Sequence, residues 1–110
     1  MKIRTDHECP LTAVFNEDGL TPRLENYYKM ARFDFVVFDI TDKNSLPIPL
    51  LAFEIDGIEH ETDEVVKSRD KKKQELSDMH NFPLIHVKNA YARRYEHVKK
   101  ILEDFFAKLE

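Results

Sequence analysis

Two hydrophobic stretches in the middle of the chain contain acidic side chains. Residues 33–40 are rich in phenylalanine, valine and isoleucine, which predicts a strand covered on both faces. Residues 49–55 predict a second strand, and the short turn between the two favours an antiparallel hairpin. Asp34 and Glu54 lie inside these strands, where a carboxylate is unfavourable unless a cation or hydrogen bonds compensate its charge.

A helix is predicted for residues 63–80, which contain strong helix formers and neither glycine nor proline. Its hydrophobic stripe has apolar ends, but the central turn carries Arg69, Asp70 and Lys73. This turn is expected either to extend past the edge of the sheet or to face a polar site.

Two further elements complete the predicted core. Residues 83–87 predict a third strand, parallel to the second because a helix connects them. Residues 93–109 predict an amphipathic helix, with apolar residues at i, i+3, i+4, i+7 and i+11. The pattern therefore predicts an α/β fold with a mixed sheet of three to four strands flanked by helices.

The N-terminal third is less regular. Residues 11–15 predict a short strand, and Pro22 is expected to open a short helix that ends at Met30, with Thr21 as its N-cap. Residues 1–110 are expected to form a single domain, with the core in residues 33–110.

Composition excludes several classes of protein. Hydrophobic residues make up 42% and charged residues 35% of the chain, which indicates a soluble globular protein. No apolar run approaches the roughly 20 residues needed to cross a bilayer. The N-terminus does not resemble a signal peptide, and the lone Cys9 cannot form an internal disulfide, so a cytoplasmic location is expected.

The charge distribution favours a local anion-binding surface. A net charge of −4 argues against binding nucleic acid by bulk attraction. Basic residues nevertheless cluster between residues 67 and 73, and Arg69, Lys72 and Lys73 are the candidates for binding a phosphate backbone. The alternative is that these side chains form an ordinary solvated helix face.

Three carboxylates define a candidate metal site. Glu54 and Asp56 are two residues apart and share a face of their strand, and a hairpin would bring Asp34 to the same end of the sheet. Such oxygen ligands suit Mg²⁺ or Mn²⁺. The alternative is an ordinary turn at Asp56. His60 could act as a base toward an attacking water, whereas His86 is expected to be a core residue.

Five separated motifs in order resemble a known superfamily. They are Asp34 to Val37, Ala52 to His60, Arg69-Asp70-x-x-Lys73, Phe82 to Ile85, and Tyr91. Over residues 33–91 the chain resembles a bacterial family of uncharacterised nuclease-like domains in the PD-(D/E)XK, or restriction-endonuclease-like, superfamily. The motif order is also similar to that of the very-short-patch repair endonucleases.

The resemblance implies an αβββαβ core and metal-dependent hydrolysis of phosphodiester bonds in DNA. It makes Asp34 and Glu54 the metal-binding acids. Asp56 stands where the superfamily usually has lysine, so His60 or Lys73 is expected to replace that group. His86 stands where the family often has arginine. Only the short helix 22–30 can serve as the N-terminal helix of the core.

The resulting hypothesis is a DNA endonuclease-like domain. Asp34, Glu54 and Asp56 would hold Mg²⁺ or Mn²⁺, His60 or Lys73 would act on the attacking water, and Arg69 would help to neutralise the phosphate. The alternative is a non-cleaving nuclease fold that binds DNA or docks within a larger helicase or repair protein. A protein–protein interaction domain is a third class, and a homodimer is left open.

Overall fold

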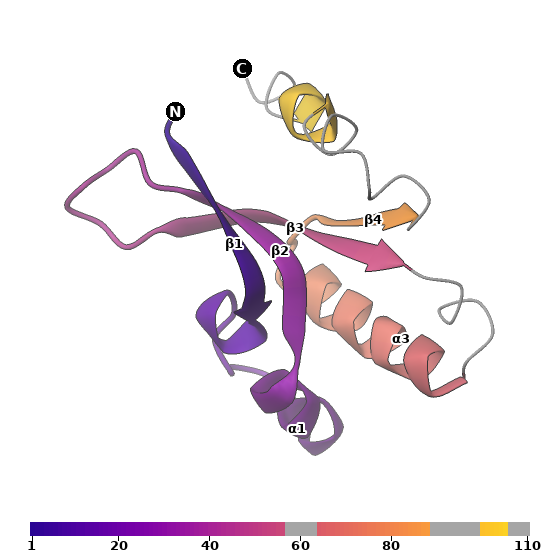
Figure 1. The fold of residues 1–110 in the computed structure, drawn as a ribbon. Helices are drawn as coiled ribbons and strands as arrows, with labels where there is room; N and C mark the ends of the chain where they lie inside the picture. Colours follow the sequence, from indigo (N-terminus) through magenta and orange to yellow (C-terminus); the bar gives the residue numbers. More distant parts are fainter. Residues whose placement is uncertain (57–63, 89–99, 106–110) are drawn as a thin grey trace.

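A computed structural model describes residues 1–56, 64–88 and 100–105 of the chain (Figure 1). Its elements in order are β1 (Ile3–Pro10), a 3₁₀ turn (Leu11–Ala13), α1 (Pro22–Met30), β2 (Arg32–Asp39), β3 (Ile48–Asp56), α3 (Glu64–Met79) and β4 (Leu84–Lys88). Residues 100–105 are also helical.

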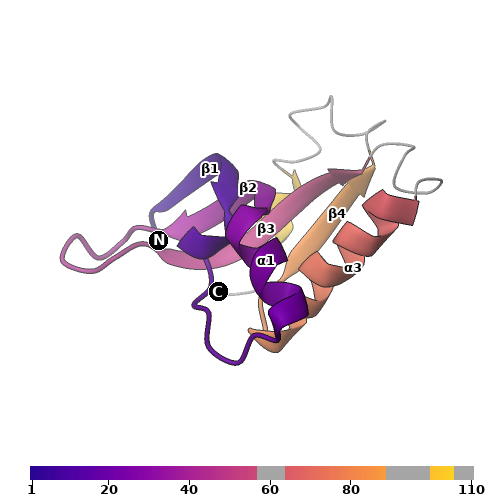
Figure 2. The same ribbon diagram turned by 90° about the horizontal axis from the view of Figure 1, so that it is seen from below.

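The strands form one mixed sheet in the order β1–β2–β3–β4. β1 and β3 both pair antiparallel with β2, whereas β4 is parallel to β3. Helices α1 and α3 cover one face of the sheet, and residues 100–105 lie over the other face (Figures 1 and 2). The predicted fold class, a mixed sheet of three to four strands flanked by helices, is confirmed.

The sheet separates two hydrophobic layers. The first, called here the helix-side core, includes Leu24 of α1, Phe33 of β2 and Leu76 of α3, each at most 2% exposed. The second, the opposite core, is built on Val37, Leu51, Phe53 and Val87, with side chains from residues 101, 102 and 105 packed against them. Both faces of β2 are therefore buried, as the unbroken hydrophobic run in its sequence predicted.

Most elements of the predicted core are confirmed. The antiparallel hairpin, the helix that follows it and the parallel third strand lie where the pattern placed them. Helix α1 has the predicted bounds, but Thr21 makes no side-chain capping bond. Of the helix predicted at 93–109, the structure describes only residues 100–105. None of the described helices has the length and apolar character needed to cross a membrane.

The strand predicted at residues 11–15 is wrong. Leu11 and Phe15 are both buried, and the Phe15 amide donates to the Leu11 carbonyl oxygen over 2.9 Å, which requires a turn and not an extended chain. The first strand lies earlier, at Ile3–Pro10, and its largely polar sequence gave no hydrophobic signal because it is an edge strand with mostly exposed side chains.

Leu76→Ala tests the helix-side core. Leu76 is fully buried, so we expect its truncation to lower the free energy of unfolding by about 2–5 kcal/mol. Leu46→Ala is the matched control, because Leu46 is 85% exposed and its loss should change stability by less than about 0.5 kcal/mol. Urea unfolding followed by circular dichroism measures both. Similar effects of the two substitutions would contradict this packing.

Candidate functional site

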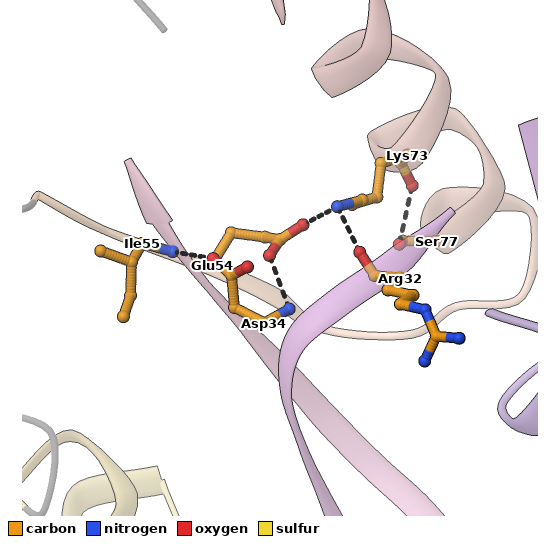
Figure 3. A network of polar contacts seen from close by, with 6 residues as sticks. All are labelled: Arg32, Asp34, Glu54, Ile55, Lys73 and Ser77. Atoms are coloured by element: carbon orange, nitrogen blue, oxygen red, sulfur yellow. Dashed lines mark hydrogen bonds and ion pairs between the residues drawn. The ribbon is translucent and has the colours of Figure 1, made fainter. Parts of the chain in front are cut away.

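The candidate site lies where β2 and β3 diverge. The backbone register between these strands runs from Asp39–Ile48 to Phe35–Phe53 and is not continued beyond that pair. Past Phe35–Phe53, the side chains of Asp34 and Glu54 lie between the two strands (Figure 3). Carboxylate oxygens here accept amide hydrogens in the way that carbonyl oxygens do in a regular ladder.

The two acids bond reciprocally across the gap. The Asp34 amide donates to Glu54 Oε2 over 2.9 Å, and the Ile55 amide donates to Asp34 Oδ2 over 2.7 Å. Glu54 is only 4% exposed, whereas Asp34 is partly buried. Charge-assisted bonds of this kind are among the strong hydrogen bonds in proteins, so each acid fixes the other's strand.

Lys73 brings a positive charge to Glu54 from the helix. Its Nζ forms an ion pair with Glu54 Oε1 and donates a hydrogen bond of 2.8 Å to the carbonyl oxygen of Arg32 (Figure 3). The same Nζ lies 5.6 Å from the centre of the Phe33 ring, a cation–π contact. Lys73 of the polar central turn therefore faces a polar site, as one of the two sequence-based alternatives predicted, whereas Arg69 of the same turn is exposed.

Burial dominates the electrostatics of Glu54. Desolvation raises the pKa of this carboxyl from 4.5 to about 7, although the Lys73 ammonium and the Asp34 amide both lower it. Removal of the Glu54 carboxyl from water therefore changes its pKa more than the ion pair with Lys73 does. A group that ionises near neutral pH in a cluster of charges is a candidate functional group.

Tyr27 of α1 is a neighbour of the site that the sequence interpretation missed. Burial raises the pKa of its phenol, and the negative charges of Glu54 and Asp70 raise it further. Lys72 Nζ lies 6.0 Å from the centre of the Tyr27 ring. Tyr27 lies three residues after the buried Leu24 and therefore on the inward side of α1.

The remaining predicted residues are placed only in part. Arg69 is exposed on α3, and Lys72 is half-buried on the same helix. Asp56 ends β3 in register with Lys88, but its side chain, like all of His60, lies outside the described part of the chain. The structure therefore brings together Asp34, Glu54 and Lys73.

Within residues 1–56, 64–88 and 100–105, no group of three or more His, Cys, Asp or Glu side chains is placed to hold a metal ion. In that part of the chain, Asp34 and Glu54 are the two acids that the structure brings together at the site.

The expectation that His86 is a core residue is wrong: it is exposed, and it is the register partner of Glu54 on β4. His86 alternates along β4 with Ile85 and Val87, whose side chains pack in the opposite core.

Comparisons with protein-family models, with curated proteins and with solved structures find no match to this chain. The resemblance to PD-(D/E)XK nucleases accordingly stays a hypothesis carried by the motifs and the site.

The pKa of Glu54 predicts how stability depends on pH. The native carboxyl holds its proton up to about pH 7, whereas an unfolded one loses it near 4.5. The native state therefore binds more protons between these values, and the free energy of unfolding should fall as pH rises through this window, by up to about 1.4 kcal/mol per pH unit. Urea unfolding at a series of pH values measures the slope.

Glu54→Gln should flatten this dependence, because the amide does not titrate. Glu17→Gln is the matched control, since Glu17 is an exposed carboxylate in a loop and its removal should leave the slope in place. Equal slopes in wild type and Glu54→Gln would show that another group titrates.

Proposed function

We propose that the chain is a metal-dependent nuclease-like domain that hydrolyses phosphodiester bonds in DNA. The observation that carries this proposal is the convergence of Asp34, Glu54 and Lys73 from β2, β3 and α3 at the diverging ends of two strands. Two carboxylates beside an amine form the set of groups that the resemblance implies for phosphodiester hydrolysis.

The position of Lys73 bears on the main departure from the superfamily motif. Asp56 occupies the usual lysine position on the strand and cannot supply a positive charge. Lys73 approaches Glu54 from the neighbouring helix, with only 14% of its side chain exposed. An ammonium group in this place can stabilise the negative charge that develops on a phosphate, whichever element carries it.

The order of elements gives partial support. β2, β3, α3 and β4 follow one another as in the ββαβ part of the implied core. Helix α1 departs from it, because α1 lies between β1 and β2 and not before the first strand. The proposal therefore rests on the site more than on the complete topology.

The donor set of the site fits a magnesium ion. Mg²⁺ in phosphoryl-transfer sites is often held by one or two carboxylates, with water and substrate phosphate completing the shell. Asp34 and Glu54 supply such a pair: each accepts a backbone amide, and Glu54 also contacts Lys73. When bound, Mg²⁺ or Mn²⁺ would polarise the scissile phosphate and lower the pKa of a water molecule.

The protein's own groups have separate roles in this proposal. Asp34 and Glu54 would hold the cation, whose positive charge would favour the ionised form of the buried Glu54 carboxyl. With the cation bound, the ion pair between Lys73 and Glu54 would be weaker. The Lys73 ammonium could then donate a hydrogen bond to a phosphate oxygen and keep its hydrogen bond to the Arg32 carbonyl oxygen. Arg69 and Lys72, on α3 beside the site, would contact the DNA backbone.

A cleavage assay tests the catalytic proposal. We expect Mg²⁺-dependent or Mn²⁺-dependent cleavage of plasmid or oligonucleotide DNA, reduced roughly 100-fold or more by Asp34→Ala, Glu54→Ala or Lys73→Met. Lys43→Met is the control for charge, because Lys43 is exposed in the hairpin loop far along the strands from the site. Full activity in Asp34→Ala or Glu54→Ala would overturn the site assignment.

Metal-dependent stability separates the enzyme from a non-cleaving DNA-binding module. If Asp34 and Glu54 hold the cation, saturating Mg²⁺ at about 100 times its dissociation constant should stabilise the wild type by about 2.7 kcal/mol. The increment should vanish in Glu54→Ala when each variant is compared with itself without metal. DNA binding that needs no metal and weakens steeply with salt would instead favour the module.

A further inference from the structure

Strand β1 contains an unusual backbone conformation beside the site. Glu8 has a φ of 50°, in the left-handed region that residues with a Cβ rarely adopt. The β1–β2 register pairs His7 with Phe35 and Cys9 with Phe33, but it does not pair Glu8 with Asp34, which lies level with it. The ladder is therefore interrupted at the position of a site carboxylate.

At this interruption, the alternation of side chains between the two faces of the sheet is reversed in both strands. Phe33 and Cys9 lie in the helix-side core. Phe35 packs against the opposite core, and the His7 ring lies 4.8 Å from the Phe35 ring, so His7 and Phe35 share that other face. In a regular strand, residues two apart point to the same face. The two strands thus reverse their alternation together, across Glu8 and Asp34.

This reversal accounts for the orientation of Asp34. In a regular strand its side chain would stand perpendicular to the sheet, above or below its plane. Here Asp34 Oδ2 instead accepts the Ile55 amide of the neighbouring strand β3, 2.7 Å away. The Asp34 carboxylate therefore points toward β3 and lies between the two strands (Figure 3).

Arg32 joins the interruption to the lysine of the site. Its Nη1 donates to the Glu8 carbonyl oxygen over 3.0 Å, so the guanidinium satisfies a carbonyl at the residue that the ladder leaves out. The carbonyl oxygen of the same Arg32 accepts the 2.8 Å hydrogen bond from Lys73 Nζ. One residue therefore contacts both the left-handed residue of β1 and the ammonium group beside Glu54.

We propose that Glu8 and Arg32 are positioning residues: the left-handed backbone at Glu8, held by the Arg32 guanidinium, turns Asp34 toward β3 and completes the arrangement of Asp34, Glu54 and Lys73. This inference rests on the proposed function in one respect, namely that Asp34 and Glu54 bind the cation. Neither residue touches the acids through its own side-chain carboxylate or guanidinium in the contacts described above.

A substitution series at Glu8 separates backbone conformation from charge. Glu8→Gly, Glu8→Asn and Glu8→Val all remove the carboxylate, but glycine and asparagine tolerate a positive φ and valine does not. We expect Glu8→Gly and Glu8→Asn to keep the wild-type Mg²⁺ affinity in titration calorimetry. Glu8→Val should weaken it roughly 10- to 100-fold, the range found when groups that orient metal ligands are removed. Equal affinities in Glu8→Gly and Glu8→Val would overturn the proposal.

Arg32→Ala is the second variant, and it decides the outcome if Glu8→Val does not fold. It removes an exposed guanidinium, and we expect a several-fold loss of Mg²⁺ affinity. Arg4→Ala is the control: Arg4 is an exposed arginine on β1, and its substitution should leave the Mg²⁺ affinity unchanged. Wild-type affinity in Arg32→Ala would contradict a positioning role.

A readout that needs no metal distinguishes failure of this inference from failure of the proposed function. Amide exchange at Ile55, measured by NMR, reports its bond to Asp34. If the wild type binds no Mg²⁺ but Glu8→Val and Arg32→Ala still accelerate exchange at Ile55 relative to Glu8→Gly, the positioning role stands and the nuclease proposal fails. Unchanged exchange in both variants would refute the positioning role itself.

Discussion

The contact between Glu54 and Lys73 is the interaction on which the arrangement of this domain depends. It places a carboxylate that is nearly inaccessible to water against an ammonium group from the helix above it. Removing one partner of such a pair is strongly destabilising, whereas replacing both by hydrophobic residues is often neutral or favourable. Net stability is thus a weak reason for the pair to be present. Its position beside Asp34, at the open ends of two strands, is the feature that the proposed function would use.

The pair also connects parts of the fold that are distant in sequence. Lys73 contacts the Arg32 carbonyl at the start of β2, and Glu54 accepts the Asp34 amide two residues later. Among the described residues, every buried side-chain nitrogen and oxygen has a hydrogen-bond partner. A satisfied polar network of this kind restricts how α3, β2 and β3 can pack, because any shift of one element leaves a buried polar group without its partner.

The sequence predicted the central part of the fold because its strands are buried and its helix is long. The run of apolar residues in β2 and the helix formers of α3 are strong signals that tertiary contacts did not override. β1 was missed because an edge strand exposes most of its side chains, so its residues show little hydrophobic pattern. The turn at Leu11 resembles a strand in sequence, because two buried residues four apart occur in either structure when the segment is short.

The site was predictable where a residue broke a pattern. Acids inside buried strands indicated Asp34 and Glu54, and a charged turn in a hydrophobic stripe indicated Lys73. Tyr27 conformed to the pattern of α1, so nothing distinguished it from an ordinary core residue. The Glu8 backbone had no sequence signal, because a glutamate in a strand gives no indication that its φ is left-handed.

The carboxylates between β2 and β3 have a consequence for how such a domain changes in evolution. Asp34 and Glu54 accept amide hydrogens that would otherwise lie between the strands without an acceptor. If the proposed function holds, a descendant without DNA cleavage would still be selected to keep both acids, because they accept amide hydrogens between the strands. Their presence in related chains would therefore indicate a shared fold and would not distinguish active from inactive members. Under the proposed function, loss of the exposed Arg69 would be the more informative marker, because its side chain is not buried in the packing of the sheet.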